Sequence, residues 1–377
     1  MSSLFIRNAT IILPSGELVG DCLIEDGKIT RLDALISAEN TPTINATGLY
    51  LAPGLIDLQC NGGFGFDFTH NPTTIWDVAA QLPQFGVTSF LPTIITSPLE
   101  TIEQAQTVLR QVVPSQPHAI PLGLHIEGPY LNPAKKGAHN PQHLRAPHSA
   151  EVDHWRPANG IRLVTLAPEL AGAHELIAQL TANGVIVSAG HSMATFAEAT
   201  AAFEAGIRYG THLFNAMPSL HHRQPGLSAA LLADERVTVG LIPDGVHVHP
   251  SLIRLIWQLV QGRLNVVTDA MAAMGCGAGV YQLGDHQVTV DATTARLGDG
   301  TLAGSIVTLD QALRNIQMWT GCTISEAIHT VTHVPADLLR LQCKGRMGIG
   351  HDADLVLLTP DLQVHTTIIN GEIAYAL

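Results

Sequence analysis

No apolar run in the 377-residue sequence reaches the length of about 18 residues that a membrane-spanning helix needs. The N-terminal stretch MSSLFIRNATIILPSG also lacks the basic segment and the long apolar core of a secretion signal. Neither a helical membrane protein nor a secreted protein is therefore predicted. We expect a cytoplasmic protein that has no membrane as a partner.

The sequence also has no closely spaced cysteine pair and an excess of negative over positive charge. The five cysteines are scattered and form no CxxC pair, which favours reduced thiols in a cytosol. The net charge of −13 argues against nucleic acid as a partner. It does not exclude a small anionic substrate, because a few cations can reverse the sign of the potential inside a cleft. With 46% hydrophobic and only 14% charged residues, the chain can build a large core.

Both ends of the chain have the alternating apolar and polar pattern that is typical of β-hairpins. Turn residues interrupt this pattern at Pro14, Gly16 and Gly27 near the start, and an Asn370–Gly371 turn stands near the end. We predict that residues 1–50 and 345–377 together form one small β-sandwich domain. Residues 51–344 would then be a second domain inserted between the two ends.

The middle of the chain alternates short apolar runs with helical patterns, which indicates repeated βα units. Eight candidate strands can be counted, at residues 50–59, 89–95, 122–128, 162–168, 185–191, 209–215, 237–245 and 264–270. Eight parallel strands with helices between them predict an α/β fold, a (β/α)₈ TIM-like barrel. Helices are expected at residues 101–112, 173–183, 195–205 (with Ser192 as N-cap), 305–319 and 323–339, and a hairpin excursion at residues 275–304.

Acidic, amide and imidazole side chains stand at the same end of six candidate strands. They are Asp57, Gln59, Asn61, His125, Glu127, His191, His212, Asp244, His247 and Asp269. Active sites of such barrels are built at the carboxyl ends of the strands. Each residue taken alone would more often be structural: a hydrogen-bonded histidine, a glutamate that caps a loop, or an aspartate that caps a helix. Their convergence on one face favours a functional site.

Glu127, His191 and His212 form an oxygen–nitrogen–nitrogen set of the kind that holds Zn²⁺ in catalytic sites. Such an ion lowers the pKa of a bound water to about 7. Asp269 could take the proton of that water and deliver it to a leaving group. In the stretch GIRYGTHLFNAMPSLHHRQPG, residues 206–226, backbone N–H groups follow His212 and Arg223 offers a planar cation for an anion.

Several motifs make the chain similar to a known family over nearly its whole length. The most specific are HIEGPYLNPAKKGAHNP at residues 125–141 and THLFNAMP at residues 211–218, supported by PGLIDLQCNG, LAPE, SAGHS, DGVHV, VTDA and LAGS. The sequence resembles the amidohydrolase superfamily and, within it, the N-acetylglucosamine-6-phosphate deacetylases. The resemblance implies that acetate is removed from the 2-acetamido group of a phosphorylated amino sugar, and it implies a homodimer.

The resemblance also assigns residues. It places the metal ligands on Glu127, His191 and His212 and the acid/base on Asp269. It implies contacts to the substrate from Ala138, His139, Asn215, Ala216, Arg223, His247, Leu302, Ala303 and Gly304. Lys135 and Lys136 are adjacent lysines in a loop and are interpreted as solvated.

One departure from the superfamily pattern concerns the first strand. Many members carry His-x-His there and hold a second metal, whereas this chain has Gln59 and Asn61. Neutral amides are poor ligands for a cation that prefers imidazole. We therefore predict one divalent ion, Zn²⁺ in the first place, with Fe²⁺, Mn²⁺ or Co²⁺ as alternatives.

Two other functions fit the same fold. A cyclic amidase or dihydroorotase-like hydrolase would usually carry the His-x-His pair and often a bridging lysine, and no lysine stands at a suitable strand end here. A barrel that serves only as an assembly subunit would tend to lose ligands or the final aspartate, and this chain keeps them. The sequence leaves open whether the sugar is N-acetylglucosamine or N-acetylgalactosamine 6-phosphate.

Overall fold

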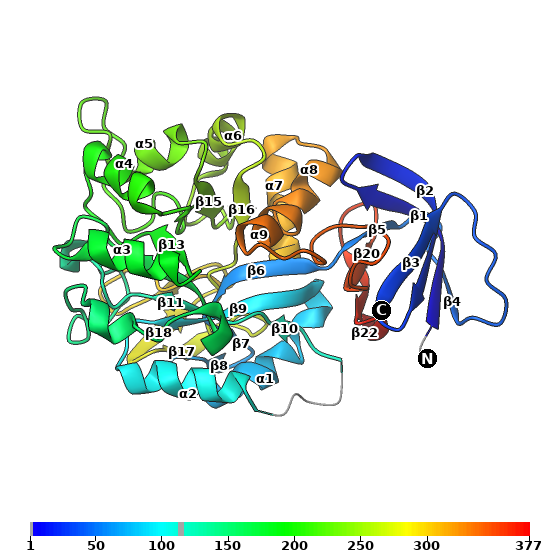
Figure 1. The fold of residues 1–377 in the computed structure, drawn as a ribbon, viewed down its shortest axis with the longest axis horizontal. Helices are drawn as coiled ribbons and strands as arrows, with labels where there is room; N and C mark the ends of the chain where they lie inside the picture. The colour runs from blue at the N-terminus through cyan, green and yellow to red at the C-terminus, as the bar shows by residue number, and fades with distance from the viewer. Residues whose placement is uncertain (1–2, 112–116) are drawn as a thin grey trace.

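A barrel of parallel strands occupies the centre of the computed structural model, which describes residues 3–111 and 117–377 (Figure 1). Consecutive strands pair in the order of the chain from β9 to β16, skipping β10, and β6 pairs with β9 on the other side. The barrel strands are β6 (Leu55–Cys60), β9 (Val87–Ile95), β11 (Leu124–Glu127), β12 (Ile161–Leu166), β13 (Ile186–Ala189), β14 (Tyr209–Gly210), β15 (Thr238–Leu241) and β16 (Leu264–Val266). The predicted (β/α)₈ class is confirmed.

The barrel closes between its first and last strands through single contacts rather than a ladder. Cys60 and Ala270 form an isolated parallel bridge. The backbone N–H of Asp269 donates to Gln59 O at 2.9 Å, and that of Asn61 donates to Ala270 O at 2.8 Å. The residues that follow β16 are therefore held directly against the end of β6.

The helices cover the outside of the barrel, as apolar faces at helical spacing require. Their bounds are α1 (Ile75–Ala79), α2 (Leu99–Leu109), α3 (Ala173–Ala182), α4 (Phe196–Ala205), α5 (Gly226–Ala233), α6 (Pro250–Leu259), α7 (Leu309–Thr320), α8 (Ile324–His329) and α9 (His333–Leu338). The prediction of a helix at residues 101–112 corresponds to α2, and its last residue, Val112, lies outside the described residues.

Two predictions about helices were wrong. The N-cap of α4 is Thr195, not Ser192: the Thr195 hydroxyl accepts from the Glu198 N–H, and the Glu198 carboxylate accepts from the Thr195 N–H. Ser192 instead donates to Glu169. The single helix expected at residues 323–339 is split into α8 and α9. Pro335 has no N–H to donate inside a helix, and the break puts it in the first turn of α9, where none is needed.

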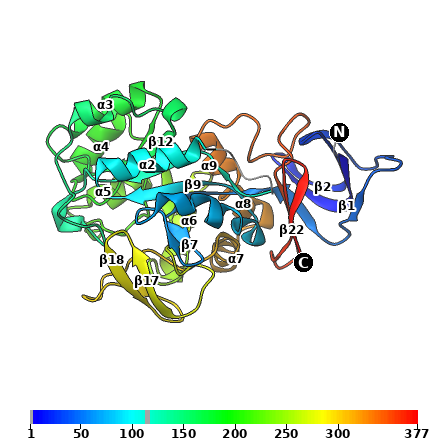
Figure 2. The ribbon, with the colours of Figure 1, turned by 90° about the horizontal axis from the view of Figure 1, so that it is seen from below.

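The hairpin excursion expected at residues 275–304 is confirmed. It forms an antiparallel sheet of β17 (Gly279–Leu283), β18 (His286–Val290) and β19 (Ala295–Arg296) beside the barrel (Figure 2). Shorter strands lie near it or at the barrel edge, namely β7 (Gly62–Gly63), β8 (Phe66–Asp67) and β10 (Ile120–Pro121).

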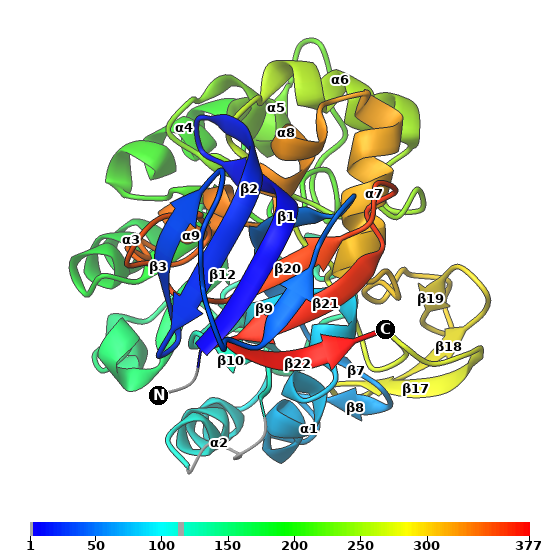
Figure 3. The same cartoon turned by 90° about the vertical axis from the view of Figure 1, so that its right-hand side faces the viewer.

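Strands from both termini form a second sheet beside the barrel (Figure 3). Its order is β22-β21-β20-β5-β1-β2-β3, with β4 beside β1. The bounds are β1 (Ser3–Leu13), β2 (Gly16–Glu25), β3 (Lys28–Asp33), β4 (Thr43–Asn45), β5 (Tyr50–Pro53), β20 (Leu355–Leu358), β21 (Val364–Ile369) and β22 (Glu372–Ala376). The strand expected at residues 50–59 is thus shared, since β5 lies in this sheet and β6 in the barrel.

A core of its own fills the terminal sheet. Ile6 and Ile24 from the N-terminal strands are buried together with Leu355 and Ile368 from the C-terminal ones. This confirms the prediction of a small β unit built from both ends. The exact domain boundaries, 1–50 with 345–377 and 51–344, stay a prediction. Among the described residues, no helix is long and apolar enough to cross a membrane.

Candidate active site

Three side chains with metal-ligating atoms meet at the carboxyl ends of β11, β13 and β14. Glu127 is the last residue of β11, and His191 and His212 each follow their strand by two residues. Glu127 Oε1 lies 3.1 Å from His191 Nε2 and 3.0 Å from His212 Nε2, and the two Nε2 atoms are 3.1 Å apart. All three side chains are buried. The structure therefore brings the three predicted ligands together.

This spacing fits one cation. Ligand atoms that share a tetrahedral Zn²⁺, with bonds of about 2.0–2.1 Å, stand about 3.3 Å from one another. The Nδ1–H of His191 donates to Lys135 O at 2.8 Å, which leaves the Nε2 lone pair directed at the cluster. The residues present can therefore hold a divalent ion.

His139 is a fourth side chain beside this cluster. It lies close enough to Glu127 and His191 for one ligand atom of each to be within 4.8 Å of the others. Its Nε2, however, is 4.0 Å from Glu127 Oε2, and its Nδ1 accepts from the Thr96 N–H at 3.3 Å. With Nδ1 as acceptor, the proton of the neutral ring belongs on Nε2. Burial holds the pKa of His139 well below its usual value. His139 is therefore a neutral hydrogen-bond donor, and His212, whose Nε2 lies within 3.1 Å of the other two ligand atoms, stays the predicted third ligand.

The carboxylate of Asp269 is held beside the cluster by the two amides of β6 and its end. Asp269 Oδ1 accepts from Gln59 Nε2 at 3.0 Å and from Asn61 Nδ2 at 2.8 Å. Gln59 Nε2 also lies 3.2 Å from Glu127 Oε2. Burial, together with the nearby charge of Glu127, raises the pKa of Asp269. The two amides thus donate to the acidic groups of the site.

Three of these residues have strained backbones. His191, His212 and Asp269 have φ angles of 48°, 30° and 47°, in the left-handed region that side chains other than glycine's rarely adopt. Such conformations cost on the order of 1–3 kcal/mol each and persist only where the surrounding structure imposes them. Placing these three side chains at the site therefore lowers the free energy of unfolding of the barrel.

Two buried residues within the strands lie beneath the site. His125 lies between Thr93 Oγ1 at 3.3 Å and Thr165 Oγ1 at 2.7 Å, and burial lowers its pKa to about 4, so the ring is neutral. Asp57 is buried at the junction of the first and last strands, where burial raises its pKa to about 7. Neither residue lines the cavity above them.

A cavity of about 640 Å³ opens over the cluster. The predicted site residues that line it are Asn61, Glu127, Ala138, His139, His191, His212, Asn215, Ala216, His247, Asp269, Leu302 and Gly304. His247 is fixed there by Asp244, whose Oδ2 lies 2.6 Å from His247 Nδ1. The backbone N–H of Asn215 donates to His212 O at 3.0 Å, which leaves Ala216 as the better candidate for an anion donor.

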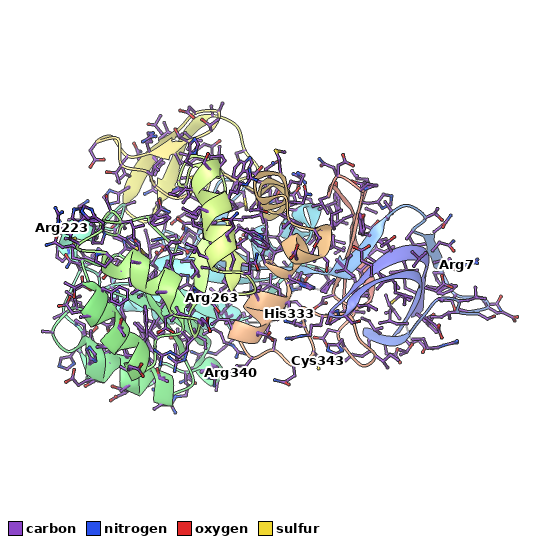
Figure 4. All side chains as sticks on the ribbon, turned by 90° about the horizontal axis from the view of Figure 1, so that it is seen from above. Arg7, Arg223, Arg263, His333, Arg340 and Cys343 are labelled. Atoms are coloured by element: carbon purple, nitrogen blue, oxygen red, sulfur yellow. The ribbon has the colours of Figure 1, made fainter. Side chains whose placement is uncertain are left out.

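Of the residues predicted as metal ligands, acid/base, substrate contacts or replaced second-metal positions, three do not line this cavity. Gln59 lies beneath it, and Ala303 is fully buried. Arg223 lies in an exposed loop at the outer edge of the molecule (Figure 4), where its Nη1 is 2.9 Å from His222 Nε2.

Sequence reasoning missed four charged residues that line the cavity: Lys135, Lys136, Arg296 and Asp299. The two lysines were interpreted as solvated, but both are only half exposed and Lys135 Nζ donates to Met217 O at 2.9 Å. The motif KKGAH, next to the predicted contact His139, is the signal that could have identified them. Arg296 and Asp299 come from the hairpin excursion, and no local pattern marks them.

A closed parallel barrel with an acidic–imidazole cluster at the carboxyl ends of its strands defines a metal-dependent hydrolase of the amidohydrolase type. The model of the amidohydrolase family matches residues 50–374. The chain belongs to the amidohydrolase family.

The relatives are more specific. The N-acetylglucosamine-6-phosphate deacetylase of Bos taurus is 41% identical and covers 98% of this chain, which covers 94% of that protein. The N-acetylgalactosamine-6-phosphate deacetylase of a Shewanella strain is 37% identical, with 99% and 96% covered. The crystal structure of a mutant N-acetyl-D-glucosamine-6-phosphate deacetylase from Mycobacterium smegmatis, in complex with N-acetyl-D-glucosamine-6-phosphate, superposes with a TM-score of 0.91 at 34% identity over 100% of both chains.

Proposed function

We propose that this chain hydrolyses the 2-acetamido group of N-acetyl-D-glucosamine 6-phosphate to give glucosamine 6-phosphate and acetate. The observation that carries this proposal is the convergence of Glu127, His191 and His212 with Asp269 at one cavity. Full-length similarity to N-acetylglucosamine-6-phosphate deacetylases supports the choice of substrate.

The cofactor in this proposal is one divalent ion, Zn²⁺ in the first place and otherwise Fe²⁺, Mn²⁺ or Co²⁺, held by Glu127, His191 and His212. When bound, it would polarise the acetamide carbonyl and make hydroxide available near neutral pH. The amide N–H groups of Gln59 and Asn61 donate to Asp269, and their neutral oxygens are poor ligands for a cation that prefers imidazole, so a second ion is not expected there.

Asp269 acts first as a base and then as an acid. It accepts a proton from the water whose oxygen forms the new bond to the carbonyl carbon. It then delivers that proton to the amide nitrogen as the carbon–nitrogen bond breaks, because an unprotonated amine is a poor leaving group. His139 stabilises the charge that develops on the carbonyl oxygen by donating from Nε2.

The remaining predicted residues hold the sugar and its phosphate. Ala138, Asn215, Ala216, His247, Leu302, Ala303 and Gly304 are proposed as substrate contacts, and Arg223 as a cation for the phosphate. A homodimer and a cytoplasmic location are proposed as well. Leu252, Leu255 and Leu259 are exposed along one side of α6 and offer a surface for such a dimer.

The proposal is tested by measuring kcat/KM for acetate release from N-acetylglucosamine 6-phosphate and from its N-acetylgalactosamine epimer on one metal-analysed sample. The expected result is a clearly higher kcat/KM for N-acetylglucosamine 6-phosphate than for its epimer. A preference for the epimer would move the assignment towards the Shewanella relative, and release from neither sugar would contradict deacetylation.

A further inference from the structure

The carboxylate of Asp57 lies buried where the first and last barrel strands meet, and the reaction described above gives it no role. It is the third residue of β6, only 2% exposed, and it does not line the cavity. A buried carboxylate is costly unless donors compensate for the lost water. Its partners therefore indicate what it does.

All three donors that Asp57 accepts from belong to the residues that hold Asp269. The Thr268 hydroxyl donates to Asp57 Oδ2 at 2.6 Å. The backbone N–H groups of Gln59 and Thr268 lie 3.2 Å and 3.3 Å from Asp57 Oδ1. Gln59 is the residue whose amide holds the Asp269 carboxylate, and Thr268 directly precedes Asp269.

This junction needs side-chain support. No ladder joins β16 to β6 within the described residues, and the Asp269 backbone is in the left-handed region. The Asp269 N–H bond to Gln59 O, at 2.9 Å, depends on the same two segments staying in register. Because no continuous ladder joins the two segments, the side-chain contacts of Asp57 add to the Cys60–Ala270 bridge and the few backbone hydrogen bonds that keep this register.

We propose that Asp57 is a positioning residue that binds Thr268 and the Gln59 backbone together and thereby fixes the carboxylate of Asp269 at the reacting atoms. The inference rests on the proposed deacetylation and concerns how its acid/base is held. Asp57 itself touches neither the substrate nor the metal ligands.

The test compares four single variants and the double variant Asp57→Asn/Thr268→Val with the wild type for kcat, KM, bound metal and Tm. Asp57→Asn weakens the hydrogen bonds that the Asp57 carboxylate accepts. Thr268→Val removes the hydroxyl that donates to this carboxylate, and Thr268→Ser keeps that hydroxyl. Asp21→Asn is the matched control, because Asp21 is also 2% exposed and accepts from the Asn8 and Ile36 N–H groups, but in the terminal sheet.

The expected result is a fall in kcat of up to about 10²-fold for Asp57→Asn and Thr268→Val, the loss that a small misplacement of a catalytic group produces. KM and the metal bound per chain should change little. Thr268→Ser should keep kcat near the wild-type value. The double variant should lose no more kcat than the more affected of Asp57→Asn and Thr268→Val. Asp21→Asn should lower Tm without lowering kcat.

The inference is overturned if the wild type is active and Thr268→Val lowers Tm but keeps the wild-type kcat. Thr268→Val also decides the question if Asp57→Asn does not fold. A wild type that releases no acetate would instead contradict the proposed function, so the two failures can be told apart.

Discussion

Gln59 and Asn61 decide, at the scale of single residues, how the acidic groups of this site are used. Each amide donates to Asp269 Oδ1, and Gln59 also donates to Glu127. The remaining ligand atoms of these two side chains are neutral amide oxygens, which are poor ligands for a cation that prefers imidazole. The proposed reaction therefore uses one set of ligands, with Asp269 as the group that exchanges the proton.

Asp269→Asn removes the proton acceptor and leaves Glu127, His191 and His212 unchanged. Positioned acid–base groups typically contribute about 10²–10⁴-fold, so we expect kcat to fall by at least about 10²-fold. Metal analysis of the same sample should show the wild-type amount of ion. A variant with near-normal kcat would remove Asp269 from this role.

The phosphate of the proposed substrate needs a cation, and Arg223 and Lys135 are two candidates for it. Arg223 was predicted from its motif but lies in an exposed loop outside the cavity, whereas Lys135 lines it. We expect Arg223→Ala to raise KM for the phosphorylated sugar much more than for N-acetylglucosamine. Lys135→Met is measured alongside it. If Lys135→Met has the selective effect and Arg223→Ala has none, the phosphate cation is Lys135.

At the scale of elements, the strands could be predicted because each is a short apolar run between turn signals. The site residues at their ends followed, since parallel strands bring their carboxyl ends to one face. What could not be predicted depends on contacts distant in the sequence. The hairpin from β17 to β19 places Arg296 and Asp299 at the cavity only because it packs against the barrel. β14 has only two residues in regular pairing, so its length could not be read from its apolar pattern either.

The N-terminus of α4 is a second element whose exact start could not be predicted from the sequence. Ser192 and Thr195 are both acceptable caps by composition, and the capping box with Glu198 decides in favour of Thr195. Thr195→Ala should lower the free energy of unfolding by about 1 kcal/mol, as the loss of an N-cap usually does. Denaturant unfolding measures this, with Thr195→Ser as the control that keeps the cap. Equal stability of all three proteins would show that the cap contributes nothing here.

At the scale of the whole molecule, the net charge of −13 contrasts with the cations at the cavity. Lys135, Lys136 and Arg296 line the cavity together with the carboxylates of Glu127, Asp269 and Asp299, so the cavity has as many cationic as acidic side chains, unlike the chain as a whole. This supports a small anionic substrate in an acidic protein. The overall composition could exclude nucleic acid, but the gathering of these cations at the cavity could only be seen in the structure.

Asp67 gives the stability of the whole protein a dependence on pH. Burial raises its pKa to about 6, while its Oδ1 accepts from the His70 and Gly284 N–H groups. Between about pH 4 and pH 6 the folded state holds more protons than the unfolded state, so the free energy of unfolding falls as pH rises. Asp67→Asn is neutral throughout and should remove this fall.

The variant should match the wild type near pH 4 and exceed it at pH 8 by up to about 3 kcal/mol, at about 1.4 kcal/mol per unit of pKa. Urea unfolding at both pH values measures the difference, with the exposed Asp33→Asn as control. A difference that does not change with pH would show that Asp67 is already ionised in the folded protein at low pH.

The central claim is that one cation, held by Glu127, His191 and His212, makes this barrel a deacetylase. The most direct test is to strip the protein with a chelator and titrate it with Zn²⁺ while measuring acetate release from N-acetylglucosamine 6-phosphate. Activity should be absent at the start and reach its plateau at one equivalent per chain. A plateau at two equivalents, or full activity in the stripped protein, would contradict the account.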